Sequence, residues 1–160
     1  MDKKILNNQI NKYNYIENYS IFKFYPSKII LKLKHADLLA RTIINNELFL
    51  IGSNSKFINT GKFNNYENLP IVFGKFTTEK FINFKKITYQ SDLSYNSIKE
   101  IFFYPSGRID IKNQDNVLIK FPIEKLDQSL KIAHQIINNK NFNNNVIDLR
   151  IPNQVILSNE

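Results

Sequence analysis

Residues 98–121, IKEIFFYPSGRIDIKNQDNVLIKF, decide the fold class, because three apolar runs in this stretch are separated by two short turns. The first run ends at Pro105-Ser106-Gly107, and the second, 108–112, alternates strictly between apolar and polar residues. Alternation with a period of two is typical of a strand that buries one face. Asn113–Asn116 precedes the third run, 117–121, so the stretch predicts a meander of three strands.

Helices are predicted on both sides of this meander. Residues 124–138 carry apolar side chains at helical spacing, and Thr77 has the properties of an N-cap for a helix whose apolar stripe includes Phe81 and Phe84. Two last apolar runs lie on either side of Pro152-Asn153 and are predicted to be strands. Strands mixed with a few helices, without regular alternation of the two, indicate the α+β class, here a mixed or antiparallel sheet with packed helices.

The amino-terminal part has its own pattern. Residues 3–13 predict a short helix, and 21–25 and 28–34 predict two strands joined by a turn at Pro26-Ser27, with the helix able to cover one face. The pair Asn45-Asn46 separates two further apolar runs and predicts a second hairpin.

Composition and charge narrow the classes of function. The chain has 160 residues and a net charge of +8, which comes from 19 lysines and only three arginines. A length of this order fits one domain, or one domain with a small additional piece. The lysines are scattered, whereas a nucleic-acid site favours a clustered stripe that includes arginine. The sequence therefore predicts a solvated lysine surface and no nucleic-acid partner.

Membrane insertion and disulfide bonding have no support in the sequence. No apolar run approaches the ~18 residues that span a bilayer, and residues 1–6 contain no hydrophobic core of a secretory signal. The chain contains no cysteine, which excludes disulfides and cysteine-based metal sites.

No constellation of catalytic residues is recognisable. The two histidines, His35 and His134, lie far apart in the sequence, and neither belongs to a metal-binding motif. Ser106 is part of a turn and has no neighbouring base in the sequence. We therefore predict no catalytic residue, no metal and no cofactor.

Two of the three arginines occur in mirrored triplets, Arg108-Ile109-Asp110 and Asp148-Leu149-Arg150. Positions two apart share one face of a strand, so each triplet places a carboxylate beside a guanidinium. In parallel neighbouring strands in register, Arg108 would face Asp148 and Asp110 would face Arg150, whereas directly opposed antiparallel strands would bring like charges together. We predict structural ion pairs that hold the register of the strands.

Several stretches resemble the bacterial cell division family FtsQ/DivIB. The similar segments are 105–111, 116–122 and 147–156, with a helix between the last two, and IDLRIPNQV is the most specific of them. Upstream, 24–31 is similar to the family's strand–Tyr/Trp-Pro–strand hairpin. One departure is Ile109, where the family often has an aromatic residue.

The resemblance implies a domain division and a non-enzymatic role. Residues 1–36 would be the carboxyl-terminal part of a POTRA domain and 37–160 the family's β-domain. The protein would be a divisome scaffold that recruits FtsB and FtsL at the septum. Its last strand, comprising Gln154, Val155, Ile156 and Leu157, would pair with a partner strand. The family is an inner-membrane protein with a periplasmic domain, so this chain would associate with the membrane only through a missing amino-terminal anchor.

Two other functions stay open at this point. The first is an outer-membrane assembly or secretion factor that contains POTRA domains. The second is a small basic RNA-binding protein, whose binding would fall steeply with salt.

Overall fold

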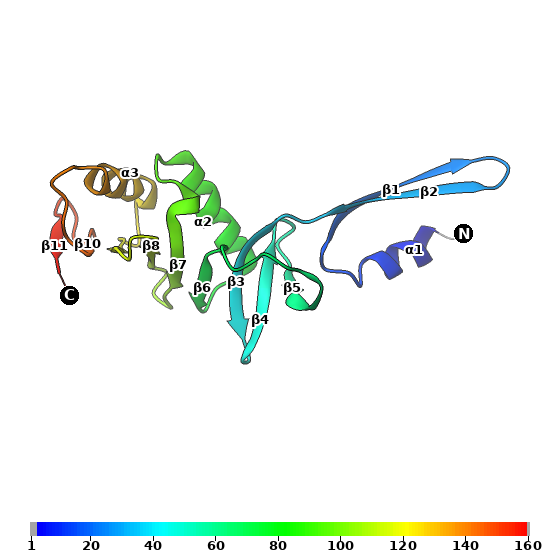
Figure 1. Cartoon of the computed structure of the whole chain (residues 1–160), viewed down its shortest axis with the longest axis horizontal. Coiled ribbons are helices and arrows are strands. Elements are labelled where there is room, and N and C mark those ends of the chain that lie inside the picture. Colours follow the sequence, from blue (N-terminus) through cyan, green and yellow to red (C-terminus); the bar gives the residue numbers. More distant parts are fainter. Residues whose placement is uncertain (1–2, 160) are drawn as a thin grey trace.

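The structure is a computed structural model that describes residues 3–159, and the molecule is elongated (Figure 1). A two-stranded hairpin projects at the amino-terminal end, and the carboxyl terminus lies at the opposite end of a body made of one large sheet and two helices. The predicted α+β class is confirmed.

The projecting unit contains one helix and two antiparallel strands. α1 (Lys3–Ile10) precedes β1 (Ile16–Phe24) and β2 (Lys28–His35), whose register runs from Phe24 opposite Lys28 to Ile16 opposite His35. The predicted helix and hairpin are confirmed, although β1 begins earlier than residue 21 and α1 ends before residue 13. The helix covers the hairpin only in part: large apolar side chains near the tip of the hairpin stay exposed.

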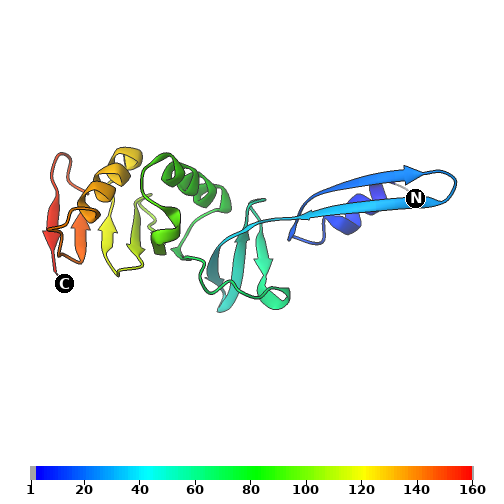
Figure 2. The same cartoon turned by 45° about the horizontal axis from the view of Figure 1, so that its top comes forward.

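Within residues 3–159 the second sheet has nine strands in the order β11-β10-β9-β8-β7-β6-β3-β4-β5 (Figure 2). β6 is parallel to β3 and β7, β9 is parallel to β10, and the other neighbours are antiparallel. The strands are β3 (Leu38–Ile44), β4 (Glu47–Gly52), β5 (Phe57–Asn59), β6 (Ile71–Gly74), β7 (Ile98–Phe103), β8 (Ile109–Asn113), β9 (Leu118–Lys120), β10 (Val146–Asp148) and β11 (Ile156–Ser158).

Local turn chemistry explains two of the connections. Asn45 and Asn46 join β3 to β4 with φ angles of 50° and 67°. Two consecutive residues with positive φ are characteristic of the tight hairpin turns that match strand twist, and asparagine tolerates this conformation. The meander predicted from 98–121 is present as β7, β8 and β9.

Two helices, α2 (Thr78–Gln90) and α3 (Leu126–Ile137), cover one face of the sheet (Figure 2). The Thr77 hydroxyl accepts a hydrogen bond from the Lys80 N–H at 3.3 Å, which confirms the predicted N-cap. Phe81 and Phe84 are fully buried under this layer. Two short 3₁₀ helices, η1 (Thr60–Lys62) and η2 (Tyr95–Ser97), lie in the connections.

A second, smaller core lies under the segment that links the hairpin to the sheet. Ala36, Leu50 and Ile58 are buried there, and Tyr15 and Phe63 pack against them. The Ala36 N–H donates to the Tyr15 carbonyl at 2.9 Å, so the amino-terminal unit and the sheet share this core.

The predicted division after residue 36 lies in the connection between β2 and β3, and it stays a prediction. The assignment of the first unit to a POTRA domain stays a prediction, and the outer ends of the two predicted domains, residues 1–2 and 160, lie outside the described residues. None of the helices in residues 3–159 is long and apolar enough to cross a membrane.

Candidate functional site

β11 forms one outer edge of the large sheet. It pairs with β10 through Val146–Ser158, Ile147–Leu157 and Asp148–Ile156, and the strand order of residues 3–159 places no other strand beside it. Val155, Ile156 and Leu157 are each exposed by about 44–45%. This edge therefore presents apolar side chains together with backbone groups that can pair with a further strand.

The direction of the backbone groups in β11 follows from the neighbouring ladder. The Leu149 N–H donates to the Lys120 carbonyl at 2.9 Å, and the Leu118 N–H donates to the Asn145 carbonyl at 2.8 Å. Residues 145, 147 and 149 thus direct their backbone groups toward β9, so those of 146 and 148 face β11. Ile156 and Ser158 then bond inward to β10, while the N–H and C=O of Leu157 point outward.

The four residues predicted to bind a partner do not all lie in this strand. Ile156 and Leu157 belong to β11, whereas Gln154 and Val155 precede it and Ser158 is included instead. The turn around Asn153, whose φ is 60°, extends further than predicted because the Gln154 N–H donates to the Ile151 carbonyl at 3.2 Å.

The opposite edge of the sheet, β5, is covered by the segment that leaves α1. The Asn14 side-chain amide donates to the Phe57 carbonyl at 3.0 Å, and the Tyr15 and Phe63 rings meet edge to face with centroids 6.0 Å apart. The two edges of the sheet thus differ, because the Asn14 side-chain amide occupies the β5 edge, whereas no strand other than β10 lies beside β11 among the described residues.

The first arginine triplet forms a buried ion pair. The Arg108 Nε lies 3.1 Å from Asp110 Oδ1, and its Nη2 donates to Oδ2 at 3.1 Å. The guanidinium lies 4.0 Å from the centroid of the Tyr104 ring, and the Phe121 N–H donates to Asp110 at 3.3 Å. Asp110 is only 1% exposed, and this burial raises the pKa of its carboxyl group although the Arg108 charge opposes the shift.

The second triplet forms a pair of similar composition near the surface. The Arg150 Nε donates to Asp148 Oδ1 at 2.9 Å, and Nη2 donates to Oδ2 at 2.6 Å. The Arg150 backbone N–H also donates to Oδ1 at 3.0 Å. These hydrogen bonds from Arg150 lower the pKa of the Asp148 carboxyl group.

The two triplets are not on neighbouring strands, because β9 lies between β8 and β10. Each arginine pairs with the aspartate of its own triplet, so the arrangement in which Arg108 faces Asp148 is absent. Asp110, Lys120 and Asp148 are successive Cα partners across β8, β9 and β10, which places a lysine between the two carboxylates. The sequence reasoning missed Lys120, whose alternation within 117–121 could have placed it on the same face.

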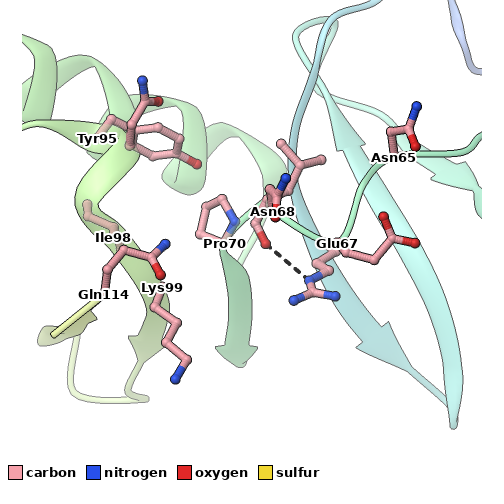
Figure 3. Close-up of a pocket in the computed structure, with 11 residues that line it drawn as sticks. Asn65, Glu67, Asn68, Pro70, Tyr95, Ile98, Lys99 and Gln114 are labelled. Atoms are coloured by element: carbon pink, nitrogen blue, oxygen red, sulfur yellow. Dashed lines mark hydrogen bonds between the residues drawn. The ribbon is translucent and has the colours of Figure 1, made fainter. Parts of the chain in front are cut away.

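A cleft of about 640 Å³ lies beside the start of β7, between that strand and residues 65–70 (Figure 3). The Tyr95 hydroxyl donates to the Leu39 carbonyl at 2.9 Å, Lys99 donates to the Asn116 side chain at 2.9 Å, and the Arg41 Nε donates to the Leu69 carbonyl at 3.1 Å. Burial raises the pKa of Tyr95. Arg41, Tyr95 and Lys99 therefore use these polar groups to hold the local structure of the cleft.

The acidic and histidine side chains of the described residues do not gather into a metal site. Within the described part of the chain, no group of three or more His, Asp or Glu side chains is arranged to hold a metal ion. His35 lies at the end of β2 with its ring 5.5 Å from that of Tyr15, and His134 lies on α3 beside Asn138.

Comparison with known proteins gives a matching family and several similar solved structures. The family described as "Cell division protein FtsQ/DivIB, C-terminal" matches residues 40–150, which is more than half of the chain. The major extracytoplasmic domain of the cell division protein DivIB from Geobacillus stearothermophilus, in its trans isomer, is similar with 13% identity and a TM-score of 0.44, over 67% of this chain and 99% of that one. No curated protein matches. The resemblance seen in the sequence is thereby confirmed, and the chain belongs to the FtsQ/DivIB family of cell division proteins.

Proposed function

We propose that this protein is a non-enzymatic divisome scaffold that recruits partners of the FtsB and FtsL type by adding a partner strand to β11. The observation that carries the proposal is the difference between the two edges of the large sheet. β5 is capped by Asn14, whereas the outward backbone groups of Leu157 have no neighbouring strand among the described residues. In β-strand addition, backbone hydrogen bonds supply affinity and alternate side chains supply specificity.

The side chains on β11 support two kinds of contact with such a partner strand. Ile156 shares a face with its cross-strand neighbour Asp148, so a residue opposite Ile156 would lie near the Asp148–Arg150 pair. Leu157 shares the other face with Ile147, on the side of the helices. A partner strand with an apolar residue at one position and a polar residue at the next fits this pattern.

The basic character of the chain does not favour the alternative of RNA binding. Each of the three arginines already donates within the protein, Arg41 to a carbonyl and the other two to aspartates. Bidentate contacts from arginine to phosphates or bases would require breaking these bonds.

The test is a proline substitution that removes one outward donor. Leu157→Pro eliminates the N–H that points away from β10 and leaves the inward-facing N–H groups of Ile156 and Ser158 in place. The loss comprises one hydrogen bond and the cost of a partner carbonyl left without a donor, together about 2–4 kcal/mol. The dissociation constant for an FtsB–FtsL peptide complex should rise about 30- to 1000-fold.

Leu157→Thr is the matched control, because it keeps the backbone donor and the preference for strand conformation. It should weaken binding far less than Leu157→Pro in isothermal titration calorimetry. Equal affinity of wild type and Leu157→Pro for the complex, with both proteins folded by circular dichroism, would refute strand addition at this edge.

A further inference from the structure

The β1–β2 hairpin carries positive charge without compensation over most of its length. Residues 18–33 include Lys23, Lys28 and Lys32 but no acidic residue. The one carboxylate in the two strands, Glu17, lies at the base and forms a salt bridge with Lys34. The outer part of the hairpin is therefore purely cationic.

Large apolar side chains are exposed around the same lysines. Phe24 is 53% exposed, Tyr25 92% and Ile29 52%, and these three residues flank the turn at the tip. In the register of the hairpin Ile29 lies opposite Lys23 on one face, and Phe24 lies opposite Lys28 on the other. Both faces of the tip thus combine an apolar residue with a lysine, which is unusual for a strand that packs one face on a protein core.

The tip also has a shallow hollow. Residues 23–29 line this depression of about 250 Å³, and Lys23 and Lys28 are the charged residues among them. Both views show the hairpin extending away from the body, with its turn at the far end of the molecule (Figures 1 and 2). A flat surface could therefore meet the tip without contacting the large sheet.

We propose that the tip of the β1–β2 hairpin binds the surface of an anionic lipid bilayer. Phe24, Tyr25 and Ile29 would enter the interface, and Lys23 and Lys28 would contact lipid phosphates on opposite faces of the tip. Aromatic and apolar residues flanked by lysines are the composition that peripheral membrane elements use. A second copy of this chain fits less well, because two such tips would bring lysines together with no acidic residue to face them. The inference stands apart from strand addition at β11, which lies at the other end of the molecule.

The experiment is co-sedimentation of the full chain with vesicles of phosphatidylcholine alone and with 30% phosphatidylglycerol. Each lysine near an anionic surface contributes about fivefold to partitioning. Lys23→Gln/Lys28→Gln should therefore lower binding to the anionic vesicles about 25-fold. Phe24→Ser/Tyr25→Ser should also lower binding, through loss of the apolar contacts. Because all four side chains are exposed, the far-ultraviolet circular dichroism spectrum should not change.

Lys131→Gln/Lys140→Gln is the charge-matched control, since it removes two exposed lysines from the other end of the chain. It should leave vesicle binding nearly unchanged, and 10 mM inorganic phosphate should not compete, because the apolar contacts require a bilayer. Three results would overturn the proposal: no binding to anionic vesicles, equal loss in the control, or concentration-dependent dimerisation that the tip substitutions abolish while lipid binding is absent.

Discussion

Arg108→Ala should destabilise the protein far more than Arg150→Ala, although both substitutions remove the guanidinium from an Arg–Asp pair two residues apart. The two pairs differ in burial. Asp110 is 1% exposed and the Arg108 side chain 25%, whereas the corresponding fractions are 13% for Asp148 and 44% for Arg150. Breaking the more buried pair leaves the Asp110 carboxylate almost out of reach of water, whereas the Asp148 carboxylate keeps some contact with solvent and can be hydrated.

The magnitude for Arg108→Ala follows from the contacts that are lost. Leaving a buried carboxylate without its partner costs about 3–5 kcal/mol, and the partial exposure of Arg108 favours the lower end of this range. The guanidinium–Tyr104 contact at 4.0 Å adds about 0.5–1 kcal/mol. A total of about 3–4 kcal/mol corresponds to a fall in Tm of about 6–16 °C for a chain of this length.

Urea unfolding followed by circular dichroism, with thermal melts in parallel, would measure both variants against wild type. The double variant Arg108→Ala/Asp110→Asn should recover part of the lost stability, because an amide is cheaper to bury than a carboxylate. Equal loss of stability in Arg108→Ala and Arg150→Ala, or no recovery in the double variant, would contradict the reasoning from burial.

Three further predictions concern acid sensitivity and the backbone. Hydrogen bonds from Arg150 lower the pKa of Asp148 below its ordinary 3.8. The ionised Asp148 therefore stabilises the fold above about pH 3.8, and this stabilisation is lost as the pH falls through the lower pKa of the folded state. Below about pH 4, the urea midpoint of Asp148→Asn should thus decline less than that of wild type. Gly74→Ala should lower the free energy of unfolding by more than about 3 kcal/mol, because φ is +92° and a Cβ would lie 1.9 Å from the Phe103 carbonyl oxygen. Gly107→Ala at φ +90° would place a Cβ 4.0 Å from Ile123 Cγ2, an ordinary contact, and should cost only about 1–3 kcal/mol. Thermal melts compare the two variants. Asn46→Gly should raise the Tm slightly, because glycine adopts the positive φ of this turn more readily than asparagine.

The elements that the sequence predicted are those set by short-range chemistry. The Asn45-Asn46 turn, the Thr77 cap and the meander of β7, β8 and β9 each depend on residues a few positions apart. The conformational preferences of these short segments do not depend on distant residues, and in this fold the tertiary contacts favour the same conformations.

The arrangement around the arginine triplets could not be read from local pattern. The triplets were predicted to lie within strands, whereas Arg108 precedes β8 and Arg150 follows β10, and the relation of the two triplets depends on which strand lies between them. β10 returns beside β9 only after α3 crosses the sheet, so Lys120, rather than a second arginine, neighbours Asp148. The capping of β5 by Asn14 is likewise a contact between residues 43 positions apart, for which the sequence carries no local signal.

The carboxyl-terminal edge combines a short strand with a rigid support. A three-residue edge offers few sites for unwanted pairing with other chains. On the side away from β11, the chain at the end of β10 is joined to β9 by the hydrogen bond from the Leu149 N–H to the Lys120 carbonyl. Just after β10, Arg150 forms a bidentate pair with Asp148. An edge that is ordered before binding loses less conformational entropy when a partner strand adds to it. Arg150 should therefore matter more for partner binding than for stability, so that Arg150→Ala weakens the complex while its urea midpoint stays close to that of wild type.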